Sequence, residues 1–205
     1  GLVAVMLWTT SILYEQLNKD LRESDDFSRW NVYLKNFLNG LKAMPYYRGR
    51  VYRGFNCQKD LEVYKKKGMV NWKTISALSK NPKVAEIFTG PQGIFFEVEV
   101  LSSRDISSIS IVSDEDEVVM LPYSCFEVLE VIENPGKPAY VKLREIPTPR
   151  APKVVFWTDD NPENNHAIAK KVEQKHVSCV FCVSTKDALN VIERYRWLLY
   201  FENAN

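Results

Sequence analysis

The chain has 205 residues, of which 45% are hydrophobic and 26% charged, and its formal net charge is +1 at pH 7. This length can bury a real core as one large domain or two small ones. The near-neutral charge gives no electrostatic reason to expect nucleic acid or an anionic membrane surface as a partner. No apolar run reaches the roughly 18 residues that a membrane-spanning helix needs, so neither nucleic acid nor a membrane is an expected partner.

Cysteine usage indicates a reducing, cytoplasmic location. Four cysteines are too few for a disulfide scaffold in a chain of this length. Cys179 and Cys182 have the spacing of a zinc-ligand pair, but they lie in an apolar strand-like run with no second Cys or His pair, so no metal site is expected. The opening Leu2–Trp8 lacks the basic segment and the cleavage site of a signal peptide. A secretory leader trimmed ahead of Gly1 remains the alternative.

The first part of the chain is predicted to be helical. Between residues 4 and 22 the later apolar side chains fit helical spacing, and Ser24–Asp26 breaks this segment and caps the next. Residues 27–44 give the clearest helical pattern, because apolar side chains recur at intervals of three and four and form one broad stripe. Pro45 ends this helix.

Alternating apolar runs then predict strands joined by turns and short helices. Tyr46–Arg50 is predicted to be a turn, and Val51–Gly54 a strand that ends at glycine. Helices are expected at Asp60–Lys67 and Pro82–Phe88, and strands within Met69–Ser79 and at Ile94–Leu101, Phe126–Ile132 and Ala139–Ile146.

Two groups of polar residues stand out within this part. Arg53 is followed by Gly54; a guanidinium offers a planar fork of donors that suits phosphate oxygens, and glycine lets a ligand approach the backbone closely. Taken alone, an arginine on a strand is more often an ion-pair partner. Further on, Glu115-Asp116-Glu117 runs straight into the apolar Val118–Pro122. Taken alone, an acidic cluster at the mouth of a strand is usually a solvated turn.

The order of three motifs resembles the Arg-Ser-Glu class of mono-ADP-ribosyltransferases. These motifs are Arg53-Gly54, the serine-bearing segment Trp72–Ser79 and the Glu-x-Glu of Glu115 and Glu117, and the resemblance covers roughly residues 4–130. It implies an α+β fold in which N-terminal helices and two packed β-sheets surround an NAD cleft. The implied activity is transfer of ADP-ribose from NAD to arginine side chains of a protein substrate, with release of nicotinamide.

The resemblance also implies roles for single residues. Arg53, beside Gly54, would hold the pyrophosphate of NAD. Glu117 would hydrogen-bond the nicotinamide ribose and stabilise the oxocarbenium-like transition state as nicotinamide leaves. Glu115 would hold the acceptor and help to remove its proton, and Glu-x-Glu marks arginine as the acceptor. Neighbouring carboxylates raise one another's pKa, which suits a base that works near neutral pH. Ser102–Ser110 resembles the family's stretch that leads into a target-recognition loop.

The serine segment departs from the family's pattern, aromatic-x-Ser-Thr-Ser. Ala77 stands where the first serine is expected and Leu78 where the threonine is expected, whereas Ser79 matches the last serine. Ser76 or Ser79 can replace the missing serine only if the register slips, and a slip of one residue turns a strand side chain to the opposite face. Both serines, with Trp72, are assigned to NAD binding. Two alternatives stay open: an NAD glycohydrolase, in which water attacks at the same site, and a non-catalytic NAD-binding or protein-interaction module, which the departure favours.

The proline-rich segment at residues 147–152 is the predicted boundary between a transferase-like domain at residues 1–148 and a small module at residues 149–205. The module begins with two strands separated by a helix. A second helix is expected over Ser184–Ile192 and a third strand over Trp197–Phe201. Strands that alternate with helices predict a parallel sheet.

This module resembles a truncated receiver-like, flavodoxin-like domain. Asp159 and Asp160 follow its first strand, as the acidic pair does in such domains. Glu202 or Asn203 stands where the phospho-accepting aspartate is expected after the third strand. A partial α/β module without a signalling role is therefore predicted.

Overall fold

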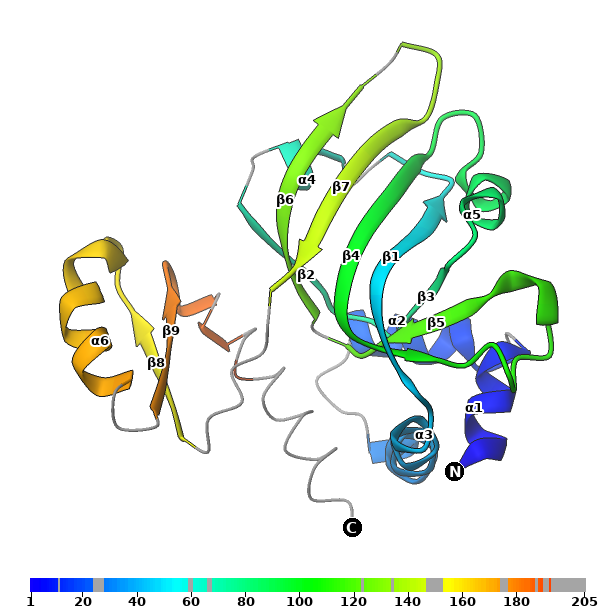
Figure 1. Ribbon diagram of the computed structural model, residues 1–205, viewed down its shortest axis with the longest axis horizontal. Coiled ribbons are helices and arrows are strands. Elements are labelled where there is room, and N and C mark those ends of the chain that lie inside the picture. Colours follow the sequence, from blue (N-terminus) through cyan, green and yellow to red (C-terminus); the bar gives the residue numbers. More distant parts are fainter. Residues whose placement is uncertain are drawn as a thin grey trace. The chain divides into compact units, whose positions relative to one another are not determined.

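The structure is a computed structural model that forms two compact units, one covering Gly1–Ile146 and one within Pro147–Glu202. None of the described helices is long and apolar enough to cross a membrane. The residues that the structure describes are 1–10, 12–23, 28–58, 61–65, 68–122, 124–133, 135–146, 153–173, 177–186, 188–189 and 192 (Figure 1).

The first unit begins with two helices where one was expected over residues 4–22. These are α1 (Leu2–Thr9) and α2 (Tyr14–Glu23). Helix α1 ends at Thr9 and Thr10 caps it, and each hydroxyl donates a hydrogen bond to the carbonyl oxygen three residues earlier, at 2.8 and 2.7 Å. Threonine side chains that bond nearby carbonyls compete with the helical pattern, which accounts for the break.

The third helix replaces the longer helix expected over residues 27–44. A 3-10 turn, η1 (Ser28–Trp30), leads into α3 (Asn31–Lys42). The apolar stripe of α3 is buried, as its periodicity predicts. The ring centroids of Trp8 on α1 and Phe37 on α3 lie 5.5 Å apart, so the N-terminal helices pack against one another through aromatic side chains.

The strands of this unit form one sheet rather than the two packed sheets that were expected. The sheet has seven strands in the order β1-β3-β5-β4-β7-β6-β2, with an additional pairing of β1 with β4. The reason lies in β4, which pairs with β1 along most of its length, with β7 over Ile94–Glu99 and with β5 through Arg104 and Asp105 at its end. One long strand therefore belongs to both parts of the curved sheet seen in Figure 1. The strands are β1 (Tyr46–Phe55), β2 (Met69–Trp72), β3 (Ser76–Ser79), β4 (Ile94–Asp105), β5 (Glu117–Met120), β6 (Ser124–Ile132) and β7 (Ala139–Glu145).

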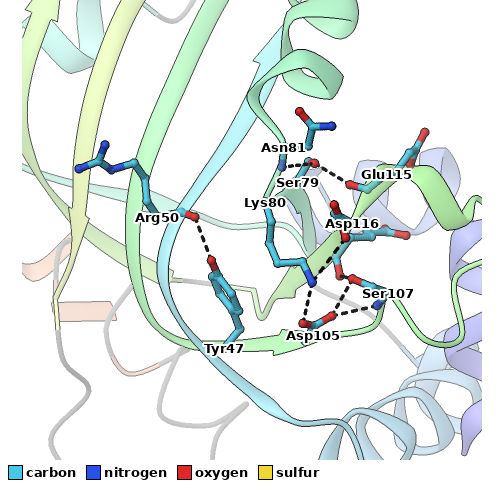
Figure 2. A network of polar contacts seen from close by, with 10 residues as sticks. Tyr47, Arg50, Ser79, Lys80, Asn81, Asp105, Ser107, Glu115 and Asp116 are labelled. Atoms are coloured by element: carbon cyan, nitrogen blue, oxygen red, sulfur yellow. Dashed lines mark hydrogen bonds and ion pairs between the residues drawn. The ribbon is translucent and has the colours of Figure 1, made fainter.

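The prediction of a turn at Tyr46–Arg50 is wrong, because these residues form the first half of β1 and pair with β4. The pairing register shifts between Tyr47 and Gly49, and Gly49 has φ +149°. A β-bulge of this kind accommodates a glycine without ending the strand. The hydroxyl of Tyr47 donates to the carbonyl oxygen of Arg50 at 3.1 Å and spans the irregular stretch (Figure 2).

The core lies on one face of this sheet and follows the alternation of β4. Ile94, Phe96, Val98 and Val100 are buried, whereas the residues between them are only partly buried. The short helix α4 (Leu61–Lys65) contributes Leu61 and Tyr64 to the same core. Burial of these apolar side chains is the main term that stabilises the sheet.

Helix α5 (Pro82–Thr89) packs directly on β1, and Gly54 makes this possible. A Cβ atom at residue 54 would lie 2.0 Å from the carbonyl oxygen of Ala85. The side chain of Asn81 caps the helix by accepting a hydrogen bond from the backbone N–H of Lys83 at 3.1 Å, and Pro82 occupies the first turn. These features fix the start of α5 directly after β3.

The second unit contains β8 (Lys153–Thr158), a 3-10 turn η3 (Pro162–Asn165), α6 (His166–Glu173) and β9 (Val177–Cys182). β8 and β9 pair in parallel, and Trp157 stacks on Phe181. The expected strand over residues 197–201, and part of the expected helix over residues 184–192, lie outside the described residues, as does the proline-rich segment 147–152.

Asp159 of this unit is engaged in local hydrogen bonds. Its carboxylate accepts from the backbone N–H of Asn161 at 2.9 Å and from the side chain of Asn165. The backbone hydrogen bond is the first cause that holds the pKa of Asp159 below its usual value. Within the described parts of the chain, no group of three or more His, Cys, Asp or Glu side chains could hold a metal ion.

Candidate active site

A cavity of about 290 Å³ opens in the first unit where α1, α2, β1, β3, α5 and the segment before β5 meet. Its wall combines aromatic side chains with one arginine and two glutamates. This mixture of apolar surface with a few convergent polar groups is typical of a ligand site. The lining residues are Trp8, Thr9, Tyr14, Tyr52, Arg53, Gly54, Ala77, Leu78, Ser79, Val84, Ala85, Phe88, Val112, Glu115 and Glu117.

Arg53 ties three elements together at one side of the cavity. Its Nη1 donates to the carbonyl oxygen of Ala77 on β3 at 3.1 Å, and its Nη2 donates to the hydroxyl of Tyr14 on α2 at 3.2 Å. The guanidinium also lies 5.7 Å from the ring centroid of Trp72. A guanidinium has five N–H donors. Arg53 therefore holds β3 in place and still presents positive charge to the cavity.

Glu117 is a nearly buried carboxylate at the start of β5. It pairs with Ser79 of β3 across the sheet, and the residue is 7% exposed. Its Oε2 accepts a hydrogen bond from the hydroxyl of Ser110 at 2.9 Å. Burial raises the pKa of Glu117 to about 7; the Ser110 bond lowers it and the nearby charge of Glu115 raises it. A carboxyl with such a pKa changes its protonation state near neutral pH.

Glu115 reaches the same cavity through a tight turn. Ser113–Glu115 forms the 3-10 turn η2, and Asp116 is left-handed with φ 48° and ψ 50°. Aspartate tolerates this region better than most residues because its short side chain bonds locally. The hydroxyl of Ser79 donates to the carbonyl oxygen of Glu115 at 2.5 Å and holds the turn against β3.

A lysine clamps the segment that carries both glutamates. Figure 2 shows the ammonium of Lys80 near the carboxylates of Asp105 and Asp116, at 2.9 and 3.7 Å. The backbone N–H of Lys80 donates to the carbonyl oxygen of Asp116 at 3.1 Å, and the hydroxyl of Ser107 donates to Asp105 at 2.7 Å. The end of β3 is thereby joined to the end of β4 and to the turn before β5.

The pKa values of this clamp follow from the same contacts. The hydrogen bond to Asp105 is the first cause that raises the pKa of Lys80. For Asp105, burial is the largest effect and acts to raise the pKa, but the hydrogen bonds from Lys80 and Ser107 outweigh it and hold the pKa below its usual value. Both partners are therefore charged over the neutral pH range.

Most of the residues selected from the sequence come together here, and two lie elsewhere. Arg53, Gly54, Ser79, Glu115 and Glu117 line the cavity, as stated above. Ser76 is buried and its hydroxyl donates to the carbonyl oxygen of Thr74 at 3.3 Å. Trp72 donates from its indole N–H to the hydroxyl of Tyr64 at 3.0 Å and packs on Phe126. Neither side chain lines the cavity, and Trp72 meets the site only through its ring contact with Arg53.

Several residues of the site were not selected from the sequence, among them Trp8, Tyr14 and Ser110. Trp8 and Tyr14 lie on N-terminal helices, where aromatic side chains at helical spacing read as core residues. Their rings are 5.0 Å apart, and Tyr14 also reaches Arg53. Ser110 lies in the stretch expected to lead into a recognition loop, but its bond to Glu117 depends on how that stretch folds.

The sequence of the first unit matches a known family. The family model of the NAD:arginine ADP-ribosyltransferases matches residues 1–149. A curated protein of Mycobacterium avium, provisionally named NAD(+)–arginine ADP-ribosyltransferase Mav, is 28% identical over 123 residues, which is 60% of this chain. The chain covers 15% of the length of that relative.

Solved structures share the fold of this unit. ADP-ribosyltransferase Vis from Vibrio splendidus, in complex with an inhibitor, matches with a TM-score of 0.61 and 22% identity over 72% of each chain. Exoenzyme S from Pseudomonas aeruginosa, in complex with human 14-3-3 protein beta and bound to carba-NAD, matches with a TM-score of 0.59 and 20% identity over 70% of this chain and 72% of that one. At such identity these likenesses show a fold of mixed helices and sheet that ADP-ribosyltransferase toxins also have.

Proposed function

Because this chain belongs to the NAD:arginine ADP-ribosyltransferase family, we propose that it transfers ADP-ribose from NAD to arginine side chains of a protein and releases nicotinamide. The observation that carries this proposal is the cavity in which Arg53, Glu115 and Glu117 meet. NAD is the substrate of enzymes of this family. Such an enzyme must bind an anionic dinucleotide, which suits the positive charge of Arg53, and must stabilise a developing cation, which suits the carboxylates of Glu115 and Glu117.

NAD would bind with its pyrophosphate toward Arg53 and its nicotinamide ribose toward Glu117. A guanidinium suits phosphate oxygens because it forms two parallel, charge-assisted hydrogen bonds. The cavity volume of about 290 Å³ is at the lower end of ligand pockets, which span about 300–1,000 Å³. We therefore assign the cavity to nicotinamide and its ribose, with Trp8, Tyr14 and Phe88 as the apolar wall.

The reaction exchanges one bond at the anomeric carbon of that ribose. The bond from this carbon to the nicotinamide nitrogen breaks, and its electron pair leaves with neutral nicotinamide. The carboxylate of Glu117 stabilises the positive charge that develops on the ribose, which is a large effect in a cavity that excludes water. A guanidine nitrogen of the acceptor then bonds to the carbon, and its proton passes to Glu115.

Three finer assignments stay proposals. The placement in the Arg-Ser-Glu class is supported by the convergence of Arg53, Ser79 and Glu117 on one cavity. The division at residues 148 and 149, with a receiver-like module after it, is supported by the parallel pairing of β8 and β9. The cytoplasmic location expected from the cysteines stays a prediction from the sequence.

The test is release of nicotinamide from NAD by the wild-type chain, Glu117→Gln and Glu115→Gln. We expect Glu117→Gln to lose at least about a hundredfold in kcat, as for removal of an electrostatic stabiliser. Glu115→Gln should still release nicotinamide but should lose transfer to a small guanidine acceptor. Glu86→Gln is the matched control, because Glu86 is exposed on α5 outside the cavity.

The other outcomes distinguish the alternatives. Release that depends on Glu117 but forms no modified acceptor would make the chain an NAD glycohydrolase. No release from the wild-type chain, together with an NAD-dependent rise in melting temperature, would make it a non-catalytic NAD-binding module.

A further inference from the structure

We propose that Ser110 is a positioning residue for Glu117, whose hydroxyl holds the catalytic carboxylate in place of the serine that residue 77 lacks. The proposal rests on the proposed function, in which Glu117 stabilises the developing cation. It is carried by the hydrogen bond from Ser110 to Oε2 of Glu117 at 2.9 Å. Among the residues that the structure describes, Ser110 is the one side chain that donates a hydrogen bond to this carboxylate.

The strand register explains why β3 leaves this role open. Ser79 lies directly opposite Glu117, and Ala77 lies opposite Val119. Residues 77 and 79 share one face of β3 with Glu117, because side chains alternate along a strand. Residue 77 is thus the diagonal neighbour of Glu117, a separation that the long side chain of Glu117 can span. An alanine there places a methyl group at this position, which cannot donate a hydrogen bond.

The two serines of β3 are committed elsewhere. A hydroxyl has a single proton to donate, and Ser79 gives it to the carbonyl oxygen of Glu115 at 2.5 Å while it accepts from the backbone N–H of Asn81 at 2.9 Å. Ser76 lies opposite Met120, on the other face of β3, and donates to the carbonyl oxygen of Thr74. Neither serine therefore reaches the carboxylate of Glu117.

The loop that carries Ser110 is built onto residue 117. The backbone N–H of Ile106 donates to the carbonyl oxygen of Glu117 at 3.0 Å, and the hydroxyl oxygen of Ser107, which donates to Asp105, lies 3.3 Å from the same carbonyl oxygen. The backbone N–H of Ser110 closes the turn by donating to the carbonyl oxygen of Ile106 at 2.9 Å. Ile106 itself is fully buried. These backbone hydrogen bonds hold the turn at residues 106–110 against the start of β5, so the hydroxyl of Ser110 lies in a fixed position beside the carboxylate of Glu117.

The charged and titratable groups around Glu117 come from three elements. Glu115 approaches from η2, Arg53 and Tyr52 from β1, and Tyr14 from α2, and all of them line the same cavity. A hydroxyl that donates to a carboxylate favours its ionised form. Loss of the Ser110 bond should therefore both release the carboxylate from its orientation and raise the pKa of Glu117 above about 7.

The experiment compares Ser110→Ala with Ser110→Thr, which keeps the hydroxyl, and with Ser108→Ala, an exposed neighbour in the same loop. The titration of Glu117 is followed by NMR in protein with labelled glutamate carboxyl carbons, assigned with Glu117→Gln. We expect Ser110→Ala to raise the titration midpoint by about one pH unit, because a hydrogen bond to a charged group is lost. Ser110→Thr and Ser108→Ala should leave the midpoint at its wild-type value.

Nicotinamide release supplies the functional readout. In Ser110→Ala, kcat should fall about tenfold while KM for NAD changes little, and the rise of kcat with pH should move upward with the titration midpoint. Ser110→Thr should keep most of the activity. Adding Ala77→Ser to Ser110→Ala should restore it, since that serine would stand beside Glu117 on β3.

An unchanged midpoint and pH profile in Ser110→Ala would overturn the proposal. Equal loss in Ser110→Ala and Ser110→Thr, or no recovery with Ala77→Ser, would also count against an exchange of roles between residues 77 and 110. If the wild-type chain released no nicotinamide, the proposed function would fail, and the NMR titration would still decide whether Ser110 acts on Glu117.

Discussion

Replacing Glu117 by glutamine should stabilise the protein at neutral and alkaline pH while it lowers kcat at least about a hundredfold. The substitution removes a carboxylate whose charge is costly in the folded state, since the residue is 7% exposed. Glutamine has nearly the same shape, and its amide oxygen can still accept the hydrogen bond from Ser110. The difference in free energy of unfolding between the two proteins should therefore depend on pH.

The magnitude follows from the pKa. Burial raises the pKa of Glu117 from 4.5 to about 7, a difference of about 2.5 pH units, and at 1.36 kcal/mol per unit this corresponds to about 3 kcal/mol. The folded state holds the proton more tightly than the unfolded state. Stability from this group is therefore complete below pH 4.5 and is lost as the pH rises through 7. The free energy of unfolding of Glu117→Gln, taken relative to that of wild type, should therefore rise by about 3 kcal/mol as the pH is raised from 4 to 8.

The assay is urea unfolding of both proteins at several pH values from 4 to 8. Glu86→Gln, an exposed carboxylate of α5, is the control and should show a small difference that does not change with pH. Any part of the difference in free energy of unfolding that is the same at every pH comes from the amide group itself and carries no information about the ionisation of Glu117. The reasoning is refuted if the difference between wild type and Glu117→Gln stays the same across this range.

Three further substitutions test other parts of the site. Gly54→Ala should cost about 1–3 kcal/mol of stability in urea unfolding, because its Cβ would lie 2.0 Å from the carbonyl oxygen of Ala85; an unchanged midpoint would mean that α5 is not packed as described. Lys80→Met leaves the carboxylate of Asp105 unpaired and should lower kcat for nicotinamide release about tenfold, whereas a purely local effect would change only stability. Arg53→Lys keeps the charge but loses the planar fork, and should raise KM for NAD about tenfold in initial-rate measurements; equal KM values would remove Arg53 from NAD binding.

The sequence identified the groups whose chemistry is visible in a short motif. Arg53 and Gly54 stand side by side in the chain, and Glu115 and Glu117 directly precede an apolar run, so each motif could be recognised locally; their order along the chain, through its resemblance to a known family, implied that they share one site. The same holds for α3, whose apolar stripe has a clear helical period. These features depend on residues that are close in the chain.

The features that escaped prediction depend on contacts between distant residues or on unusual backbone. Tyr14 bonds Arg53 across 39 positions, and nothing in the helical pattern of α2 signals that contact. The single sheet arises because β4 continues to Asp105 and pairs with β5, a matter of strand length and curvature. Gly49 reads as a turn residue, but a bulge in the pairing with β4 accommodates it.

Ser110 shows how the two kinds of information combine. The alanine at residue 77 is plain in the sequence as a departure from the family's pattern. The group that replaces the serine is plain only in the structure, where the loop after Asp105 folds back onto residue 117. A missing motif residue is therefore weak evidence for a dead site until the surrounding hydroxyl groups have been placed.

The most direct test of the central claim is the ratio of modified acceptor to released nicotinamide. The chain is incubated with NAD and a small guanidine acceptor, and both products are quantified in the same reaction. Transfer to arginine predicts a ratio close to one, and product formation at least about a hundredfold slower with Glu117→Gln. Nicotinamide without modified acceptor, or product formation by Glu117→Gln at the wild-type rate, would contradict the account.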